Sequence, residues 1–182
     1  INAPLATIIV DNFSVEGWAK ISSLTGDNQI IFHNGNSFLN GWGLLISSTG
    51  TLVVLYGGTS YNATPFLCSL NQWCHFALVR ASGITKAYAN GTEVFNSTIA
   101  SPNAPTNNFC IGNMSTGTNF FKGVIDNVKV YNTALTAQQI NDLYIKGEIC
   151  NGFDDDNDGL IDEACIPTVS IEGKNINEGN SD

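Results

Sequence analysis

The sequence predicts an all-β, two-sheet antiparallel jelly-roll sandwich with one short C-terminal helix and a calcium-loop appendage. Short apolar runs separated by turn residues fill residues 7–131, without helical periodicity. Several of the separating turns contain glycine, which favours tight hairpins and therefore antiparallel order. With 182 residues, 43% of them hydrophobic and 10% aromatic, the chain can bury one full core.

Ten strands are expected, and ten short strands around one core indicate a jelly roll. They are residues 7–10, 12–22, 29–33, 43–48, 51–56, 73–80, 85–89, 93–95, 109–112 and 123–131. The pairs Asn34-Gly35, Thr49-Gly50, Ser82-Gly83 and Asn90-Gly91 supply the positive backbone angles of the turns between them.

Strand phase predicts which side chains reach the core. In residues 12–22, the period of two puts one set on a single face, namely Phe13, Val15, Ala19 and Ile21. The other set consists of Glu16, Trp18 and Lys20, and here Trp18 is expected to be able to line a groove. Both faces of residues 73–80 are apolar, so this strand should be central, and Trp73 and His75 are expected in the core.

A short helix is predicted after the last strand. Thr136 is a suitable N-cap with Gln139 three residues later, which is the spacing of a capping box. Ile140 and Leu143 begin an apolar stripe, and Gly147 is the expected stop. The helix should therefore close the sandwich.

An acidic stretch between Cys150 and Cys165 has the spacing of an EF-hand-type calcium loop. The candidate metal ligands in it are Asp154, Asp156, Asp158, Leu160, Asp162 and Glu163. Clustered carboxylates repel one another unless a hard cation lies among them, and Gly159 permits the bend. Calcium is the expected cofactor, and the alternative is a solvated acidic linker.

The loop departs from an EF-hand at position twelve, because Cys165 stands where a bidentate Glu is needed and Glu163 comes two residues early. No EF-hand helix pair is expected. A disulfide between Cys150 and Cys165 would instead close the loop and stabilise it by roughly 3 kcal/mol.

Charge and cysteine content limit the possible partners and compartment. Seven basic against sixteen acidic residues give a net charge of −9, which disfavours nucleic acid and anionic membranes. No run approaches the ~20 apolar residues of a membrane span, so no membrane insertion is expected. Cysteines and the abundance of Asn, Ser, Thr and Gly indicate an extracellular or cell-surface location. Cys68 is expected to pair with Cys110, which leaves Cys74 as a buried thiol.

Several segments together resemble the laminin G-like, concanavalin A-like domain of secreted multidomain proteins. They read F-S-V-E-G-W-A-K, G-W-G-L, W-C-H-F-A-L-V-R, K-A-Y-A-N-G, F-C-I-G-N and G-V-I-D-N-V-K-V-Y-N, and they cover nearly all of residues 1–147. This resemblance implies a two-sheet jelly roll. The usual opening strand F-D-G-x-x-D-Y is missing, so the start looks truncated. Asp126 matches the calcium ligand of some members, and an Asp held by hydrogen bonds is an equal alternative.

The C-terminal part resembles two further families. The cysteine-flanked loop is similar to a metal-binding repeat of secreted bacterial surface proteins and to thrombospondin type 3 calcium loops. P-T-V-S-I followed by N-E-G-N-S-D resembles the opening of a Calx-beta domain. The expected domains are therefore the jelly roll at 1–147, the calcium loop at 148–166, and at 167–182 a linker with the first strand of a following domain.

No catalytic residues are predicted. Glycoside hydrolysis needs two carboxylates across a cleft, and the acidic residues of the sandwich lie on separated segments. His33 and His75 suggest no nucleophile triad. Polar loops with occasional aromatic residues suggest sugar binding instead, with Tyr61, Asn119 and Phe120 as candidate ligand-binding residues.

The sequence therefore favours a non-enzymatic, calcium-binding module of a large bacterial cell-surface or secreted protein. Adhesion through glycan or matrix ligands is its expected role, with neighbouring domains of the same polypeptide as partners and filament assembly as a further possibility. A calcium-stiffened spacer of a surface stalk is the alternative, and a glycoside hydrolase ranks third.

Overall fold

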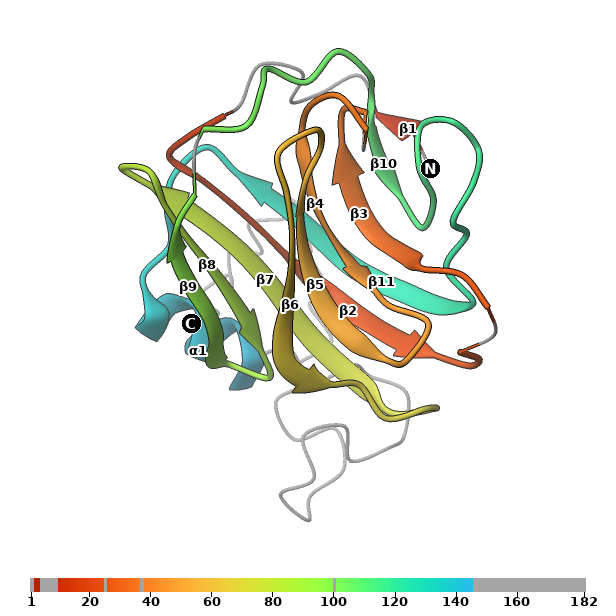
Figure 1. The fold of residues 1–182 in the computed structure, drawn as a ribbon. Helices are drawn as coiled ribbons and strands as arrows, with labels where there is room; N and C mark the ends of the chain where they lie inside the picture. The colour runs from red at the N-terminus through yellow and green to blue at the C-terminus, as the bar shows by residue number, and fades with distance from the viewer. Residues whose placement is uncertain (1, 4–9, 25, 37, 100, 146–182) are drawn as a thin grey trace, which may run out of the picture.

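The chain forms a sandwich of two antiparallel sheets with one short helix, which confirms the predicted fold class (Figure 1). The computed structural model describes residues 2–3, 10–24, 26–36, 38–99 and 101–145. No helix among these residues has the length and apolar character needed to cross a membrane.

Six strands form the first sheet. In spatial order they are β1 (Asn2–Ala3), β10 (Phe109–Ile111), β3 (Gln29–Asn34), β4 (Trp42–Ile46), β5 (Thr51–Tyr56) and β6 (Ser60–Leu67). The five-stranded sheet has the order β11 (Gly123–Tyr131), β2 (Phe13–Ile21), β7 (Trp73–Ala81), β8 (Ile84–Ala89) and β9 (Thr92–Thr98). Helix α1 spans Ala137–Ile145.

Nine of the ten predicted strands are present with small shifts at their ends. The prediction missed β6, because its sequence S-Y-N-A-T-P-F-L is largely polar and contains Pro65. Proline lacks the N–H that a central strand needs, but β6 lies at the sheet edge, where one side of the strand is unpaired. The two-residue strand β1 was also missed, and the predicted strand at 7–10 falls almost wholly outside the described residues.

The core lies between the two sheets and confirms the predicted strand phase. Phe13, Val15, Ala19 and Ile21 are all buried in it. Phe13 of β2 stacks across the sheets on Trp42 of β4, with ring centroids 4.2 Å apart and an interplanar angle of 21°. β7 is the middle strand of the five-stranded sheet, as its two apolar faces predicted.

Trp18 does not line a groove, contrary to the prediction. Its side chain is 2% exposed, because helix α1 covers this outer face of the five-stranded sheet. The Trp18 ring lies 5.8 Å from the ring of Tyr144 on the helix and 5.3 Å from that of His75. His75 is fully buried, as expected.

A buried carboxylate ties the outer face of this sheet together. Glu16 contacts His75 Nε2 at 3.2 Å, Lys129 Nζ at 3.1 Å and the Tyr131 hydroxyl at 3.2 Å. Burial opposes ionisation of Glu16, but the hydrogen bond from His75 and the charge of Lys129 hold its pKa below the ordinary value. A lowered carboxyl pKa stabilises the fold at neutral pH, and this contribution is lost on acidification.

The predicted capping box begins helix α1. Thr136 Oγ1 accepts the Gln139 backbone N–H at 3.2 Å, and Gln139 Oε1 accepts the Thr136 N–H at 2.9 Å. Ile140 is fully buried against Ala77 and Val79 of β7. The expected stop at Gly147 lies outside the described residues.

The predicted Cys68–Cys110 pairing is wrong. All three cysteines of the described part are buried free thiols. Cys68 lies in the core with Cys74, and their thiols are within hydrogen-bonding contact. Cys110 follows Phe109, which is a core residue, so the strand period turns its side chain to the other face of the six-stranded sheet. The Cys150–Cys165 pair falls outside the described residues.

Replacing Ile140 by alanine should destabilise the protein by about 2–5 kcal/mol, because it removes a fully buried side chain between α1 and the sheet. Ile145→Ala is the matched control on the same helix, since Ile145 is 50% exposed, and it should cost less than about 1 kcal/mol. Urea unfolding of both variants measures the difference. Equal costs would show that α1 does not pack as described.

Candidate functional site

Three loops, two of them rich in asparagine, meet at one end of the six-stranded sheet. Their described residues are 35–36 and 38–41 between β3 and β4, 57–59 between β5 and β6, and 101–108 before β10, and we call them the asparagine rim. Figure 1 shows these connections along one end of the sandwich. Because loop residues on a rigid sandwich commonly carry binding functions, this rim is the first place to look for a site.

Asn40 fixes the first of these loops to the last. Its Oδ1 accepts the backbone N–H groups of Asn36 at 3.0 Å and of Thr106 at 3.2 Å, and its Nδ2 donates to Thr106 Oγ1 at 2.8 Å. The side chain is 7% exposed, so loss of these bonds would leave a nearly buried amide unsatisfied. One amide therefore sets the spacing between two loops.

Backbone contacts complete this arrangement. Asn103 donates from Nδ2 to the Leu39 carbonyl at 3.1 Å, and its own carbonyl accepts the Gly41 N–H at 3.0 Å. Gly41 has φ +85°, and a Cβ there would collide with the carbonyl oxygen of Asn34. Only glycine combines this backbone conformation with so close an approach. The rim is consequently a preformed surface.

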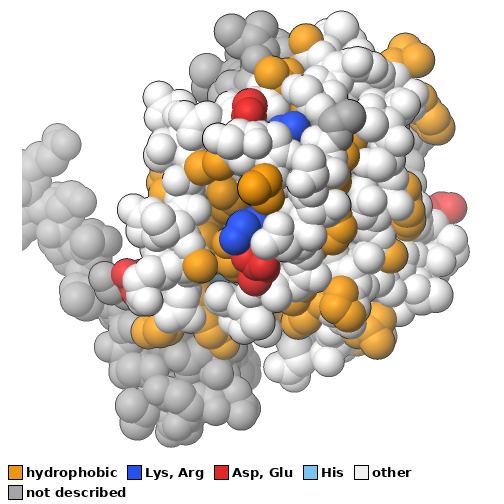
Figure 2. Space-filling view, turned by 60° about the vertical axis from the view of Figure 1, so that its left-hand side comes forward, with side chains coloured by type: hydrophobic (Ala, Val, Ile, Leu, Met, Phe, Trp, Pro, Cys, Tyr) orange, Lys and Arg blue, Asp and Glu red, His pale blue; other side chains and the backbone are white. Residues whose placement is uncertain are grey.

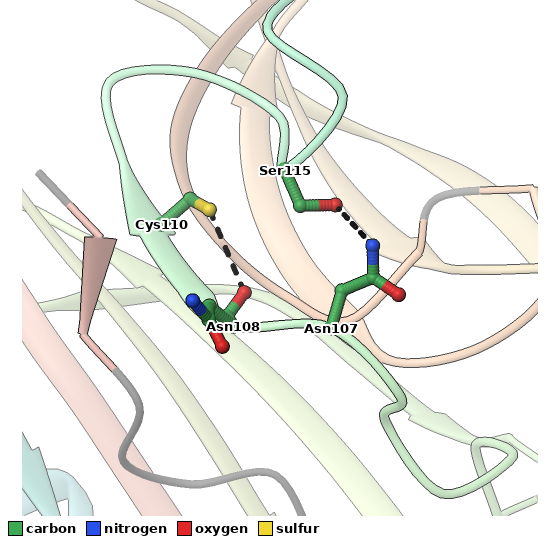
Figure 3. A pocket seen from close by; sticks show the side chains of 4 residues that line it. All are labelled: Asn107, Asn108, Cys110 and Ser115. Atoms are coloured by element: carbon green, nitrogen blue, oxygen red, sulfur yellow. Dashed lines mark hydrogen bonds between the residues drawn. The ribbon is translucent and has the colours of Figure 1, made fainter.

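A pocket of about 190 Å³ opens at the rim beside β10 (Figure 3). It is lined by Asn107, Asn108, Cys110 and Ser115. Asn107 donates to Ser115 Oγ at 3.1 Å, and Ser115 Oγ donates to the Gly35 carbonyl at 3.0 Å. The volume is below the ~300 Å³ of a typical enclosed ligand pocket. It can therefore hold part of a small polar ligand while the remainder lies along the rim.

Phe38 and Leu39 project from the tip of the first loop. They are 76% and 64% exposed, although both are large apolar residues. The Asn36 side chain accepts the Phe38 N–H at 3.0 Å, which fixes the backbone under the aromatic ring. An exposed ring on a fixed backbone, next to amides and hydroxyls, can stack on an apolar ligand face while the polar groups bind hydroxyls.

The structure does not bring the three predicted ligand-binding residues together. Tyr61 is 51% exposed on β6, opposite Leu55 in the register. Phe120 is 60% exposed on the loop after β10, and its neighbour Asn119 is a structural residue. The Asn119 carbonyl accepts the Ile30 N–H at 3.0 Å, and its side chain donates to the Asn28 carbonyl at 2.9 Å. Asn119 is therefore attached to β3, whereas Tyr61 lies on β6, three strands away. Roughly 14 Å separates these two strands.

Sequence reasoning selected Tyr61, Asn119 and Phe120 but missed the loop that contains Phe38 and Leu39. A signal was present there, because the apolar pair Phe38-Leu39 stands between Asn36 and Asn40-Gly41, inside a turn. Apolar residues in a turn have no core to enter, so they tend to be exposed.

The described residues do not test the predicted metal ligands. Asp126 is exposed, and its carboxylate accepts the neighbouring Asn127 N–H at 2.8 Å, so calcium binding by Asp126 stays a prediction. No cluster of three or more His, Cys, Asp or Glu residues capable of holding a metal occurs in the described part of the chain. The acidic loop between Cys150 and Cys165 lies outside it, so calcium binding there stays a prediction.

Two acidic residues that the sequence placed on separate segments are neighbours in the fold. Asp126 on β11 pairs in register with Trp18, two residues from Glu16 on β2. Glu16 is buried and its two oxygens contact His75, Lys129 and Tyr131. A ligand cannot reach Glu16 without displacing these partners.

His33 is a buried polar residue next to the pocket. It lies on β3 between Cys110 of β10 and Gly43 of β4 and is 1% exposed. Burial lowers the pKa of His33 to about 4, and the contact with the Gly35 backbone offsets only part of this effect. The His33 ring is thus neutral at physiological pH.

One family matches most of the chain. Residues 1–141 fit the family described as the concanavalin A-like lectin/glucanases superfamily, in its laminin G-like branch. A comparison with curated proteins found no match.

Solved structures share the fold. Trypanosoma rangeli sialidase in complex with the inhibitor DANA aligns at a TM-score of 0.64 and 19% identity, over 76% of this chain and 23% of the sialidase. Domain 4 of AbnA, a GH43 extracellular arabinanase from Geobacillus stearothermophilus in complex with arabinotriose, aligns at 0.64 and 24% identity, over 79% and 71%. A heptameric SAP-like pentraxin from Limulus polyphemus aligns at 0.56 and 22% identity, over 79% and 72%. At these identities the likeness establishes the fold.

These neighbours contradict the prediction that the chain is a non-enzymatic adhesion module. They also contradict the alternative prediction, a calcium-stiffened spacer. The fold recurs in chains of a sialidase and an arabinanase, which are enzymes of carbohydrates. The prediction had placed glycoside hydrolases last because no carboxylate pair was visible in the sandwich. That argument concerned catalytic residues within this fold and overlooked that the fold itself occurs as a part of such enzymes.

Gly41→Ala should distort the rim, because alanine disfavours the positive φ and its Cβ would collide with the Asn34 carbonyl. Gly117→Ala is the matched control, since Gly117 has φ +76° but a Cβ there would meet no atom within 4 Å. The control should cost about 1–2 kcal/mol, and Gly41→Ala about 2 kcal/mol more. Thermal and urea unfolding measure both, and equal costs would contradict a close-packed rim.

His33 should remain neutral down to about pH 4, whereas an ordinary histidine titrates near 6.5. Between these values the unfolded chain binds a proton that the folded chain does not, so stability should fall by about 3 kcal/mol as the pH drops from 6.5 to 4. NMR titration can assign both histidines of the chain, and urea unfolding gives the stability. A His33 that titrates near pH 6.5 would show that the ring is accessible to solvent.

Proposed function

Since this chain belongs to the concanavalin A-like lectin/glucanase superfamily, we propose that it is the carbohydrate-binding part of an enzyme that acts on glycans. The observation that carries the proposal is the asparagine rim. It combines a pocket lined by amides and a hydroxyl with the exposed ring of Phe38 on a fixed loop. Sugars present the matching chemistry, with hydroxyl groups at the ring edge and C–H groups on the faces.

The polar groups of the rim suit hydroxyl ligands in number and type. Asn108 lines the pocket with an exposed side chain, and an amide offers both a donor and an acceptor. A sugar hydroxyl also donates and accepts, so one amide can bind two adjacent hydroxyls. Neutral donors and acceptors of this kind confer orientation without the desolvation cost of a charge.

Rigidity of the rim favours binding by such weak contacts. Asn40, Asn103 and Gly41 hold the loops before any ligand arrives. A preformed surface loses little conformational entropy on association, which matters when each contact contributes little. We expect micromolar to millimolar affinity, because the pocket is shallow and encloses only part of a ligand.

A binding domain of this kind would raise the local concentration of substrate at a catalytic centre in the same polypeptide. The recurrence of the fold in a sialidase and in an arabinanase bound to arabinotriose supports this context. Binding by this chain and hydrolysis of the bound glycan are separate properties, and one experiment can measure both.

Phe38→Ala should weaken oligosaccharide binding about two- to tenfold, because it removes a stacking surface worth roughly 0.5–1.5 kcal/mol. Phe120→Ala is the matched control, since Phe120 is also a largely exposed phenylalanine on a loop. The full chain is screened on a glycan array, the best ligands are measured by isothermal titration calorimetry, and chromatography of the same mixtures detects hydrolysis products.

The outcomes separate the alternatives. Loss of binding with Phe38→Ala alone supports the rim, and loss with Phe120→Ala alone moves the site to the loop predicted from sequence. Silence of the intact chain across the array would overturn the proposed function. Hydrolysis products would show that the chain itself carries a catalytic centre.

A further inference from the structure

Among the described strands, charged side chains occur on only one of the two sheets. Residues 28–79 and 94–121 contain no Asp, Glu, Lys or Arg, although 13% of the chain is charged. These two stretches supply β3, β4, β5, β6 and β10, which together with the uncharged β1 make up the whole six-stranded sheet. They also supply every loop of the asparagine rim. The site proposed above therefore lies in a wholly uncharged region.

The edge strands of the two sheets differ in charge, and this difference is not explained by burial. An edge strand usually carries charged residues, often lysine, because they prevent unwanted pairing with other chains. β9, the edge of the five-stranded sheet, follows this rule, since its Glu93 forms a 2.8 Å ion pair with Lys86 of β8. β6, the edge of the six-stranded sheet, is half exposed and carries none. Burial alone does not explain the difference between the two layers.

The face that carries β8 and β9 has few charges, and they lie close together. Figure 2 brings forward the side of Figure 1 on which β8 and β9 lie, and it shows basic and acidic side chains together in the middle of that face. Most of the remaining surface in this view is uncharged.

Charge is also unevenly distributed along the chain. Ten of the sixteen acidic and two of the seven basic residues belong to residues 146–182, which leaves six acidic and five basic residues for residues 1–145. The sandwich is therefore nearly neutral, and the net charge of −9 comes mainly from the C-terminal residues. A net negative chain repels anionic polymers at long range, most strongly at low salt.

We propose that the asparagine rim selects uncharged glycans and rejects those that carry carboxylates, such as sialylated or uronic-acid sugars. This inference rests on the proposed function. A carboxylate at the rim would lose hydration without gaining a cation, because neither the rim nor its sheet supplies one. The rim would then discriminate in two ways: an acidic glycan is disfavoured by its unpaired carboxylate, and a neutral glycan is favoured by its hydrogen bonds.

The test uses pairs of glycans in which one member carries carboxylates and the other carries none. One pair is a homogalacturonan oligosaccharide and its fully methyl-esterified form, and further pairs are N-glycans with and without terminal sialic acid. At 150 mM NaCl, the full chain should bind the neutral member of each responding pair at least about tenfold more tightly. Binding of the neutral member should change little between 50 and 500 mM NaCl.

The possible failures are distinguishable. Equal or tighter binding of the acidic members would overturn the inference and leave the proposed function standing. Silence of the intact chain across the whole glycan array would overturn the proposed function itself.

A substitution adds the missing charge. Asn108→Lys places a cation at the pocket and should tighten binding of an acidic member roughly two- to fivefold at 50 mM NaCl, with the gain lost at 500 mM. Thr98→Lys, at an exposed position on β9, adds the same net charge on the other sheet and should leave the preference unchanged. An equal gain in both variants would attribute the discrimination to net charge and contradict selection at the rim.

Discussion

The stack of Phe13 on Trp42 joins the two sheets at the end of the sandwich where the asparagine rim lies. Trp42 also packs against Phe109 of β10, with ring centroids 6.1 Å apart. The Trp42 ring therefore contacts β2 of the opposite sheet and β10 of its own sheet. It directly follows Asn40 and Gly41 in the chain. Since Trp42 is fully buried and cannot shift without opening the core, it holds the loop before it in place. Core packing and the geometry of the site are therefore parts of one arrangement.

Much of the fold follows from local sequence patterns. The alternation along residues 13–21 identified the core face of β2, and Thr136 with Gln139 identified the start of helix α1. Both features depend on residues a few positions apart, which is the range that periodicity and capping rules describe. The acidic loop at 150–165 was the strongest local pattern of all, yet its chemistry concerns a part of the chain separate from the rim.

Other features depend on contacts that a local pattern cannot contain. Trp18 has the phase of an exposed residue, but helix α1 returns from far along the chain to cover it. Cys68 and Cys74 share the core, whereas Cys110 was preferred as a partner because Cys74 lies within an apolar strand. β6 has the composition of a loop and becomes a strand only because β5 offers it a partner. The rim escaped notice for the same reason, since Asn40 and Thr106 meet only in the folded chain.

Functional expectations failed at a different level. A net charge of −9 describes the chain as a whole, but residues 1–145 taken alone are nearly neutral. The search for paired carboxylates asked whether this fold could be a catalyst, while sialidase and arabinanase chains contain the same fold as one portion of a larger whole. Charge and catalytic motifs are best assessed separately for each structural unit.

The glycine at position 41 has a consequence for recognition. Gly41 packs so closely on the Asn34 carbonyl that no side chain fits there, and this contact fixes the loop. A loop fixed in this way cannot change its shape to fit different ligands. If the rim binds oligosaccharides as proposed, a flexible ligand would have to adapt to the rim, and its affinity would depend on the fraction of its solution conformations that already fit. The geometry of the glycosidic linkage sets that fraction, so the rim would distinguish linkages without contacting the glycosidic bond.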